Sequence, residues 1–147
     1  MSETKITAPY FDIQRIFLKD ISYEAPHTPQ IFSKEWKPEV QLNIETKNTA
    51  LNENLYEVVL SVTATATSNG ESAFLIEIHQ AGVFTLTNLP DEQLQHMLHA
   101  YCPNILLPFA RQAISDMVTQ GGFPPLLLAP VNFDALFAEH LKNQKKE

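Results

Sequence analysis

The amino-acid sequence predicts an α+β protein, in which a four-stranded antiparallel sheet precedes a kinked long helix and a C-terminal amphipathic helix. Three observations support this prediction. Apolar and polar residues alternate through much of residues 11–87, as in half-buried strands. Beyond Pro90 the apolar spacing becomes helical. The length of 147 residues is usual for one domain, and we expect a single domain over residues 1–147.

The first strand is expected over residues 11–24. One of its faces carries the apolar side chains Phe11, Ile13, Phe17, Ile21 and Tyr23. Ile16 and Leu18 break the alternation. Residues 25–38 contain three prolines, which do not fit a central strand, so we expect a crossing segment there. The second strand follows over residues 39–45.

A polar turn over residues 48–54 is expected to lead into the third strand, residues 56–66. Asn69-Gly70 predicts a tight hairpin, because both residues tolerate positive φ angles. The fourth strand then covers residues 74–79, and Gly82 predicts a bulge in its continuation.

The first helix is expected to begin after Pro90 and to be kinked at Pro103. Its second part, residues 105–118, is apolar on nearly every side. Gly121-Gly122 ends it, and Asn132 caps the last, amphipathic helix. One sheet cannot cover so apolar a helix, and we therefore expect a homo-oligomer, most simply with twofold symmetry. The alternative is that the kinked helix folds back on its own chain.

Composition restricts the function and the location. A formal net charge of −7 argues against nucleic acid as a partner. No apolar run reaches the roughly 20 residues that cross a bilayer, so no membrane association is expected. The single cysteine, Cys102, fits a reducing compartment, and the first residues lack the pattern of a secretory signal. These observations predict a cytoplasmic protein.

Motifs for catalysis or phosphate binding are absent from the sequence, which contains only four glycines. The nearest approach to a metal site is His96-x-x-His99-x-x-Cys102. Residues at i and i+6 of a helix point well apart, and no further ligand motif supports the trio. We interpret these residues as solvated histidines and a core thiol, and we expect no metal, no cofactor and no enzymatic activity.

Two irregular segments are unusually apolar. The proline-rich crossing segment carries Ile31, Phe32 and Trp36, and the connector over residues 123–131 is equally apolar. Loops are normally polar and exposed. These segments either pack down as lids on the core or line a groove, and their nearness to an amphipathic helix favours a groove.

A second candidate surface is acidic. Asp20 and Glu24 share a face of one strand, and Leu75 and Glu77 share a face of another. Carboxylates around an exposed leucine would suit a basic peptide with an apolar anchor. The pattern by itself is better explained by a solvated sheet face.

Several stretches of the sequence are specific enough to indicate a family: Ile13-Gln-Arg-Ile16, Lys19-Asp-Ile-Ser22, Glu24-Ala-Pro26, Tyr56-Glu-Val-Val-Leu60, Ala100–Leu107 (AYCPNILL) and Ala129–Phe137 (APVNFDALF). The last two are long and specific. In these stretches the chain resembles the SecB family of bacterial protein-export chaperones, and the resemblance covers nearly its whole length. In two places the chain differs: His99 stands where the family has glycine, and the family continues in an acidic tail whereas this sequence ends at Glu147.

The resemblance implies a homotetramer, built as a dimer of dimers with the kinked helix at the subunit interface. It implies that unfolded precursor proteins are the clients and that the SecA translocation motor is the partner. In the family, an acidic face receives the basic, zinc-bearing C-terminal tail of SecA, and the matching residues here are Asp20, Glu24, Leu75 and Glu77. The zinc belongs to the partner, so no metal is expected on this chain.

A client is expected to lie extended in apolar grooves. We expect these grooves to be lined by Trp36, Val40, Leu42, Ile44, Phe74, Leu126, Phe137 and Leu141. The protein would keep precursors unfolded for export and deliver them to SecA. Two other functions stay open: a carrier of small apolar ligands, with the same lining forming a closed pocket, and a structural assembly subunit without affinity for unfolded chains.

Overall fold

The computed structural model describes residues 8–145 as one long sheet with helices on one side. The elements in chain order are β1 (Tyr10–Glu24), the 3-10 turn η1 (Gln30–Ser33), β2 (Pro38–Asn52), β3 (Leu55–Ser68), β4 (Glu71–Thr87), α1 (Asp91–His96), the π-helical turn η2 (Met97–Tyr101), α2 (Cys102–Gln120) and α3 (Phe133–Lys145). The predicted α+β fold is confirmed. Within residues 8–145, no helix has the length and apolar character that crossing a membrane requires.

The sheet is antiparallel with the strand order β1-β4-β3-β2, so β1 and β2 are its two edges. Asn69 and Gly70 have φ angles of 53° and 79°, which confirms the predicted hairpin between β3 and β4. The predicted polar turn over residues 48–54 is wrong in its extent, because β2 continues to Asn52. Residues 48–52 pair with β3 at a largely exposed edge, where a strand does not need apolar side chains.

Strand β1 contains two irregularities that change which side chains face the core. The register to β4 shifts between Ile13 and Arg15 and again between Leu18 and Asp20. Each shift inserts one residue and reverses the alternation. Between the two shifts, Ile16, which broke the predicted pattern, therefore pairs with Gly82 and packs against the core, whereas Phe17 pairs with Ala81 on the opposite face of the sheet. The predicted apolar face of β1 was wrong for Phe17. Ile13 lies on the predicted face opposite Phe84 but is 40% exposed at the sheet edge.

Gly82 does not form the predicted bulge, because β4 continues in register past it. A Cβ at this position would lie 2.8 Å from the Phe84 ring and 3.1 Å from the Leu106 side chain. The glycine is therefore explained by the Phe84 ring of the same strand and the Leu106 side chain of α2, which both pack over this position.

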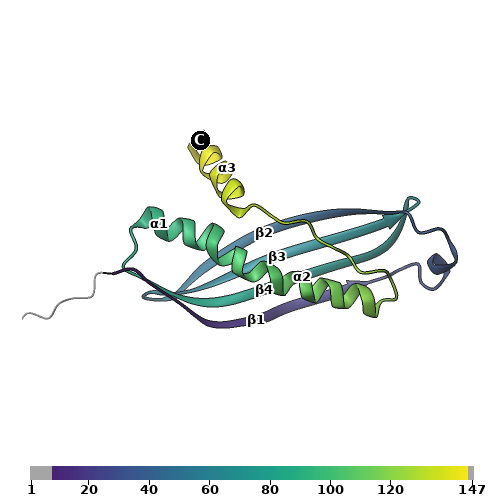
Figure 1. The fold of residues 1–147 in the computed structure, drawn as a ribbon, viewed down its shortest axis with the longest axis horizontal. Coiled ribbons are helices and arrows are strands. Elements are labelled where there is room, and N and C mark those ends of the chain that lie inside the picture. Colours follow the sequence, from purple (N-terminus) through teal and green to yellow (C-terminus); the bar gives the residue numbers. More distant parts are fainter. Residues whose placement is uncertain (1–7, 146–147) are drawn as a thin grey trace, which may run out of the picture.

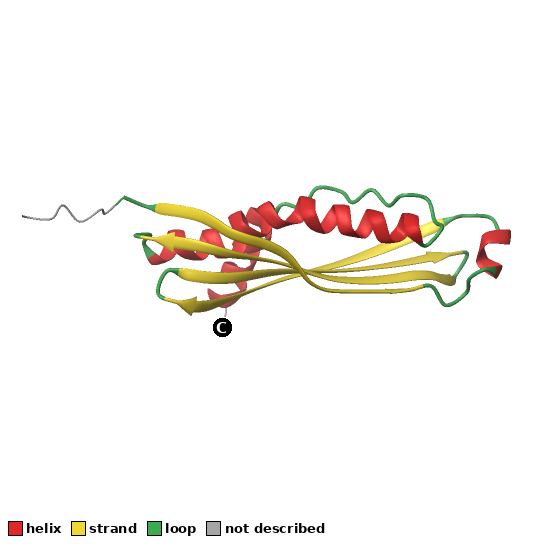
Figure 2. Cartoon of the chain, turned by 90° about the horizontal axis from the view of Figure 1, so that it is seen from below, coloured by secondary structure: helices red, strands yellow, loops and turns green. Residues whose placement is uncertain are grey.

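The long helix runs without interruption from Asp91 to Gln120 through α1, η2 and α2. The predicted disruption near Pro103 takes the form of the π-helical turn η2, which ends just before it. A proline lacks the amide hydrogen of a regular helix, and π-helical turns occur mostly as single turns inside α-helices. Figure 2 shows α2 along one side of the sheet, and the opposite side of the middle of the sheet is uncovered.

The core lies between α2 and the helix-facing side of the central strands. Its fully buried side chains include Phe74, Phe84, Leu60, Ile76, Ile78, Leu106 and Ile114. From the end of α2 an extended connector returns across this side of the sheet, and α3 projects beyond the β2 edge (Figure 1). This path places the connector, β2 and α3 at the rim of the core.

Candidate functional site

The predicted groove residues lie on the helix-bearing side of the sheet, mostly along its β2 edge. Val40 and Leu42 are 37% and 38% exposed, and their Cα partners in β3 are the buried Ala66 and Ala64. Ile44 follows in the same row and is half-buried. Because alternate residues of a strand share a face, these three side chains form a continuous apolar row, which we call the β2 row.

One end of the β2 row meets an aromatic cluster. Phe123, which starts the connector, lies 5.3 Å from Trp36, 5.1 Å from Phe32 and 5.2 Å from Phe74, measured between ring centroids. Trp36 is half-buried and Phe32 is exposed. A cavity of about 160 Å³ opens between the crossing segment and the start of the connector. A rigid aromatic wall of this kind suits large apolar side chains.

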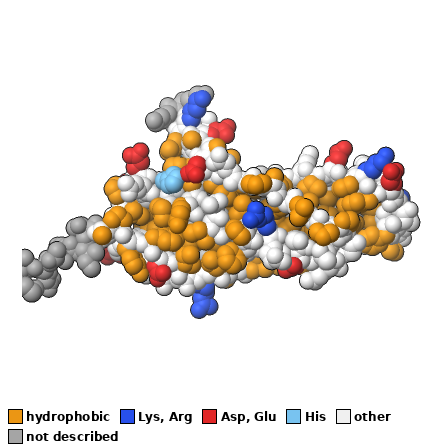
Figure 3. All heavy atoms as spheres, in the orientation of Figure 1, with side chains coloured by type: hydrophobic (Ala, Val, Ile, Leu, Met, Phe, Trp, Pro, Cys, Tyr) orange, Lys and Arg blue, Asp and Glu red, His pale blue; other side chains and the backbone are white. Residues whose placement is uncertain are grey.

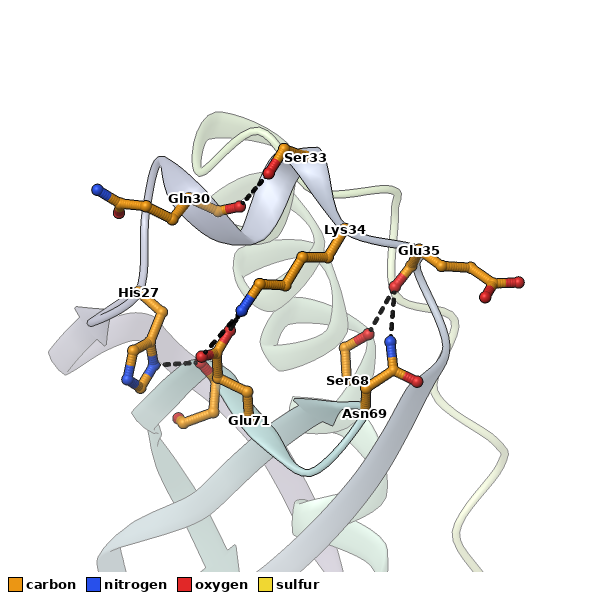
Figure 4. A network of polar contacts seen from close by, with 9 residues as sticks. His27, Gln30, Ser33, Lys34, Glu35, Ser68, Asn69 and Glu71 are labelled. Carbon is orange, nitrogen blue, oxygen red and sulfur yellow. Dashed lines mark hydrogen bonds and ion pairs between the residues drawn. The ribbon is translucent and has the colours of Figure 1, made fainter.

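Polar contacts hold the crossing segment in place beside this cluster (Figure 4). Lys34 Nζ lies 3.2 Å from Glu71 Oε1, and the carbonyl oxygen of Glu35 accepts hydrogen bonds from Asn69 Nδ2 and Ser68 Oγ. Ser68 Oγ in turn accepts a hydrogen bond from the Lys37 amide at 2.9 Å. The β3–β4 hairpin therefore fixes the backbone on both sides of Trp36.

The other end of the β2 row meets α3. Phe137 is half-buried and Leu141 is 39% exposed. A cavity of about 580 Å³ separates α3 from α1 and is lined by Leu89, Glu92, Gln93, His96, Met97, Phe137 and Leu141. A second cavity, of about 200 Å³, joins Ile44 of the β2 row to Phe137, Leu136 and His99. In Figure 3 apolar side chains spread widely over this side of the molecule.

Two predicted groove residues lie elsewhere. Phe74 is only 1% exposed and belongs to the core beneath Phe123, so the prediction that it lines an open groove was wrong. On strand β4 its side chain faces α2, and the connector closes over it. Leu126 borders a separate cavity of about 450 Å³ between the connector and α2, together with Pro108, Arg111, Gln112, Ser115, Leu127 and Leu128.

Some apolar residues of this surface were not predicted to line a groove. Phe123 and Phe32 lie in the two segments that the sequence marked as unusually apolar, and this signal was sufficient to find them. Leu89 and Met97 reach the α3 cavity only because the long helix and α3 pack against each other. No local pattern indicates that contact.

The predicted acidic residues come together on the opposite, uncovered side of the sheet. The Cα partner of Glu24 is Leu75, that of Ser22 is Glu77, and that of Asp20 is His79. Since alternate residues share a face, Asp20, Glu24, Leu75 and Glu77 form one surface across β1 and β4, which we call the acidic face. Leu75 is 39% exposed at its centre.

Hydrogen bonds orient part of the acidic face. Glu77 Oε1 lies 3.1 Å from His79 Nε2, and His79 Nδ1 lies 2.7 Å from Ser61 Oγ. The series Glu77, His79 and Ser61 has the same order of side chains as the carboxylate, histidine and serine of a hydrolase triad. It lies on the side of the sheet opposite the helices, with the Glu77 side chain exposed, and we assign it no catalytic role.

The trio of His96, His99 and Cys102 is divided between two environments. Cys102 is fully buried, as expected for a core thiol, and burial raises its pKa to about 12. His96 is exposed, as predicted, and only His99 is less solvated than predicted. His99 is half-buried against Phe137, and His96 pairs with Asp134 of α3. Among the described residues, no group of three or more His, Cys, Asp or Glu is placed to hold a metal ion.

Comparison with known proteins identifies a family and a solved structure with a similar fold. The family model described as preprotein translocase subunit SecB matches residues 4–144. A SecB-like chaperone from Mycobacterium tuberculosis, solved in complex with a ChAD peptide from the HigA1 antitoxin, has a TM-score of 0.70 and 16% sequence identity, over 83% of this chain and 91% of that one. A protein of unknown function from Streptococcus agalactiae has a TM-score of 0.46 and 9% identity, over 84% of this chain and 99% of that one.

Proposed function

The chain belongs to the SecB family, and we propose that it is a molecular chaperone that keeps precursor polypeptides unfolded for export and delivers them to SecA. The observation that best supports this proposal is the exposed β2 row, with an aromatic cluster at one end and the α3 cavities at the other. A stretched client can lie along the row and place large apolar side chains at both ends. A folded protein hides such side chains and is not bound.

The energetics favour long clients over short ones. Burying one client Leu or Phe contributes roughly 1.5–3 kcal/mol before ordering costs are subtracted. A single contact therefore gives negligible affinity. Several contacts along one chain, and along several subunits, raise the effective concentration of each further contact and give tight overall binding. This mode of binding does not need ATP.

Delivery to SecA is assigned to the acidic face. Its carboxylates, Asp20, Glu24 and Glu77, complement a basic peptide, and Leu75 offers an apolar anchor between them. The acidic face and the β2 row lie on opposite sides of the sheet. A client and the motor can therefore be bound at the same time.

A homotetramer is the proposed assembly. Its support is apolar surface that one chain leaves uncovered: on the long helix, Tyr101 is 46% exposed and Phe109 is 48% exposed. Side chains of this kind on a helix face suit a subunit interface. Analytical ultracentrifugation is expected to give a mass of four chains.

The proposed function is tested by refolding a client. A slow-folding protein is denatured, reduced and diluted into buffer with or without near-stoichiometric amounts of this chain. Delayed recovery of client activity, without ATP, is the expected result. Recovery at an unchanged rate would contradict the proposal.

A further inference from the structure

Helix α3 is held against the long helix by stacked aromatic rings that include histidines. The His99 ring lies nearly parallel to Phe137, at 14° with centroids 5.2 Å apart, and to His140, at 23° and 5.5 Å. His96 meets the edge of Phe137 at 6.0 Å. His99 is therefore stacked with two α3 rings, one of which is titratable itself.

The start of α3 is anchored differently. Phe133 is buried in the core, and the Ala135 amide donates a hydrogen bond to Asn132 Oδ1 at 2.9 Å, which caps the helix. These contacts do not depend on histidine protonation. Loss of the ring contacts would thus free the later turns of α3 while its beginning stays attached.

Protonation acts directly on the ring contacts. Burial, and secondly the neighbouring His140, lower the pKa of His99 from its ordinary value of 6.5. A released α3 would leave His99 in water, where its pKa returns towards that value. The released state then binds more protons than the docked state as the pH falls below about 6.5. Docking is therefore favoured at neutral pH and weakens towards acid.

The charged groups around His99 do not cancel this effect. His96 of α1 forms an ion pair with Asp134 of α3, and protonation of His96 strengthens this pair. The two side chains are 49% and 75% exposed, so solvent screens their interaction. Glu92 of α1 lines the cavity of about 580 Å³ between α3 and α1, and it does not line the cavity of about 200 Å³ that contains His99. Strand β2 presents the uncharged Ile44 and Thr46, because its charged Glu45 and Lys47 belong to the opposite face. The remaining charged side chains of this part of α3, Glu139 and Lys142, are exposed.

We propose that His99 and His140 form a pH-sensitive latch, which releases the later turns of α3 from the long helix below about pH 6.5. The consequence for clients rests on the proposed function. Because Phe137 and Leu141 form one wall of the α3 cavity, release removes that wall and weakens binding of an unfolded client.

The latch is tested by hydrogen–deuterium exchange of residues 133–143 at about pH 7.5 and about pH 5.5, which lie on either side of the ordinary pKa of histidine. The measured exchange is corrected for the intrinsic exchange rates at each pH. The parent protein is expected to lose protection in α3 several-fold at the lower pH. His99→Phe keeps a flat ring against Phe137 without a titratable group, and this variant is expected to stay protected at both pH values. His140→Gln is expected to reduce the pH effect.

His27→Gln is the matched control. His27 lies beside the β3–β4 hairpin, where its Nδ1 contacts the Ser72 carbonyl oxygen, and its replacement is expected to keep the parent's pH dependence. Equal protection of the parent at both pH values, or the same loss in His99→Phe as in the parent, would overturn the latch. Client binding is measured separately at about pH 7.5, where the latch is closed, so that absence of binding there contradicts the proposed function and not the latch.

Discussion

Tyr23 and Gly121 are in unusually close contact. A Cβ at Gly121 would come within 1.9 Å of the Tyr23 hydroxyl oxygen, although the Gly121 φ of −76° suits any residue. Space, and not backbone conformation, therefore accounts for this glycine. The Tyr23 hydroxyl is buried without a hydrogen-bond partner among the described residues, and burial raises the pKa of Tyr23.

Tyr23→Phe is expected to leave the free energy of unfolding unchanged or to raise it, because an unsatisfied buried polar group costs about 1–3 kcal/mol. Denaturant titration measures the change. Ser68→Ala is the control, since the buried Ser68 hydroxyl has partners on both sides and its loss is expected to destabilise the protein. An equal loss of stability in both variants would show that the Tyr23 hydroxyl has a stabilising partner.

At the scale of elements, the contribution of α3 to client binding is the simplest to test. Phe137→Ser and Leu141→Ser together are expected to weaken binding of an unfolded client roughly tenfold or more, because each lost apolar contact is worth about 1.5–3 kcal/mol and 1.4 kcal/mol corresponds to tenfold. Isothermal titration calorimetry measures the affinity. Ala138→Ser, on an exposed position of the same helix, is the control. Unchanged affinity in the double variant would remove α3 from the site.

Sequence patterns identified most elements, and their failures have physical causes. Alternation predicted β3 well because both of its neighbours are strands and its apolar side faces the core. It failed in β1, where two bulges reverse the faces of Ile16 and Phe17, since a bulge leaves no signal in composition. It also ended β2 too early, because an exposed edge strand does not need an apolar face.

The candidate site was predictable to a similar degree. Residues two or four positions apart on one strand, such as Val40 and Leu42 or Asp20 and Glu24, were placed together correctly, since the strand alone determines their common face. Phe74 was misplaced because its burial depends on Phe123, which is distant in sequence. The stacking of His99 on α3 likewise depends on how two helices pack.

On the scale of the whole molecule, the two proposed surfaces lie on opposite sides of one sheet, so they should be separable by mutation. Asp20→Lys and Glu24→Lys together are expected to abolish binding of the SecA C-terminal tail and to spare binding of unfolded clients, because only the acidic face changes sign. Fluorescence anisotropy with a labelled tail peptide measures this, and added salt is expected to weaken the parent complex.

Glu45→Lys is the matched control, since Glu45 lies on the same side of the sheet but on the opposite edge strand. It is expected to reduce tail binding far less. Loss of both tail and client binding in the Asp20 and Glu24 variant would indicate misfolding, and full retention of tail binding would move the motor contact away from the acidic face.

The central claim is that an unfolded client lies along the β2 row, and neighbouring positions of one strand test it most directly. Leu42 faces the helix-bearing side and Asn43 the uncovered side, and both are exposed. A photoreactive amino acid is placed at either position, and the protein is irradiated with a reduced, labelled client. Strong crosslinking from position 42 and little from position 43 is the predicted result. Equal crosslinking from both positions, or more from position 43, would contradict it.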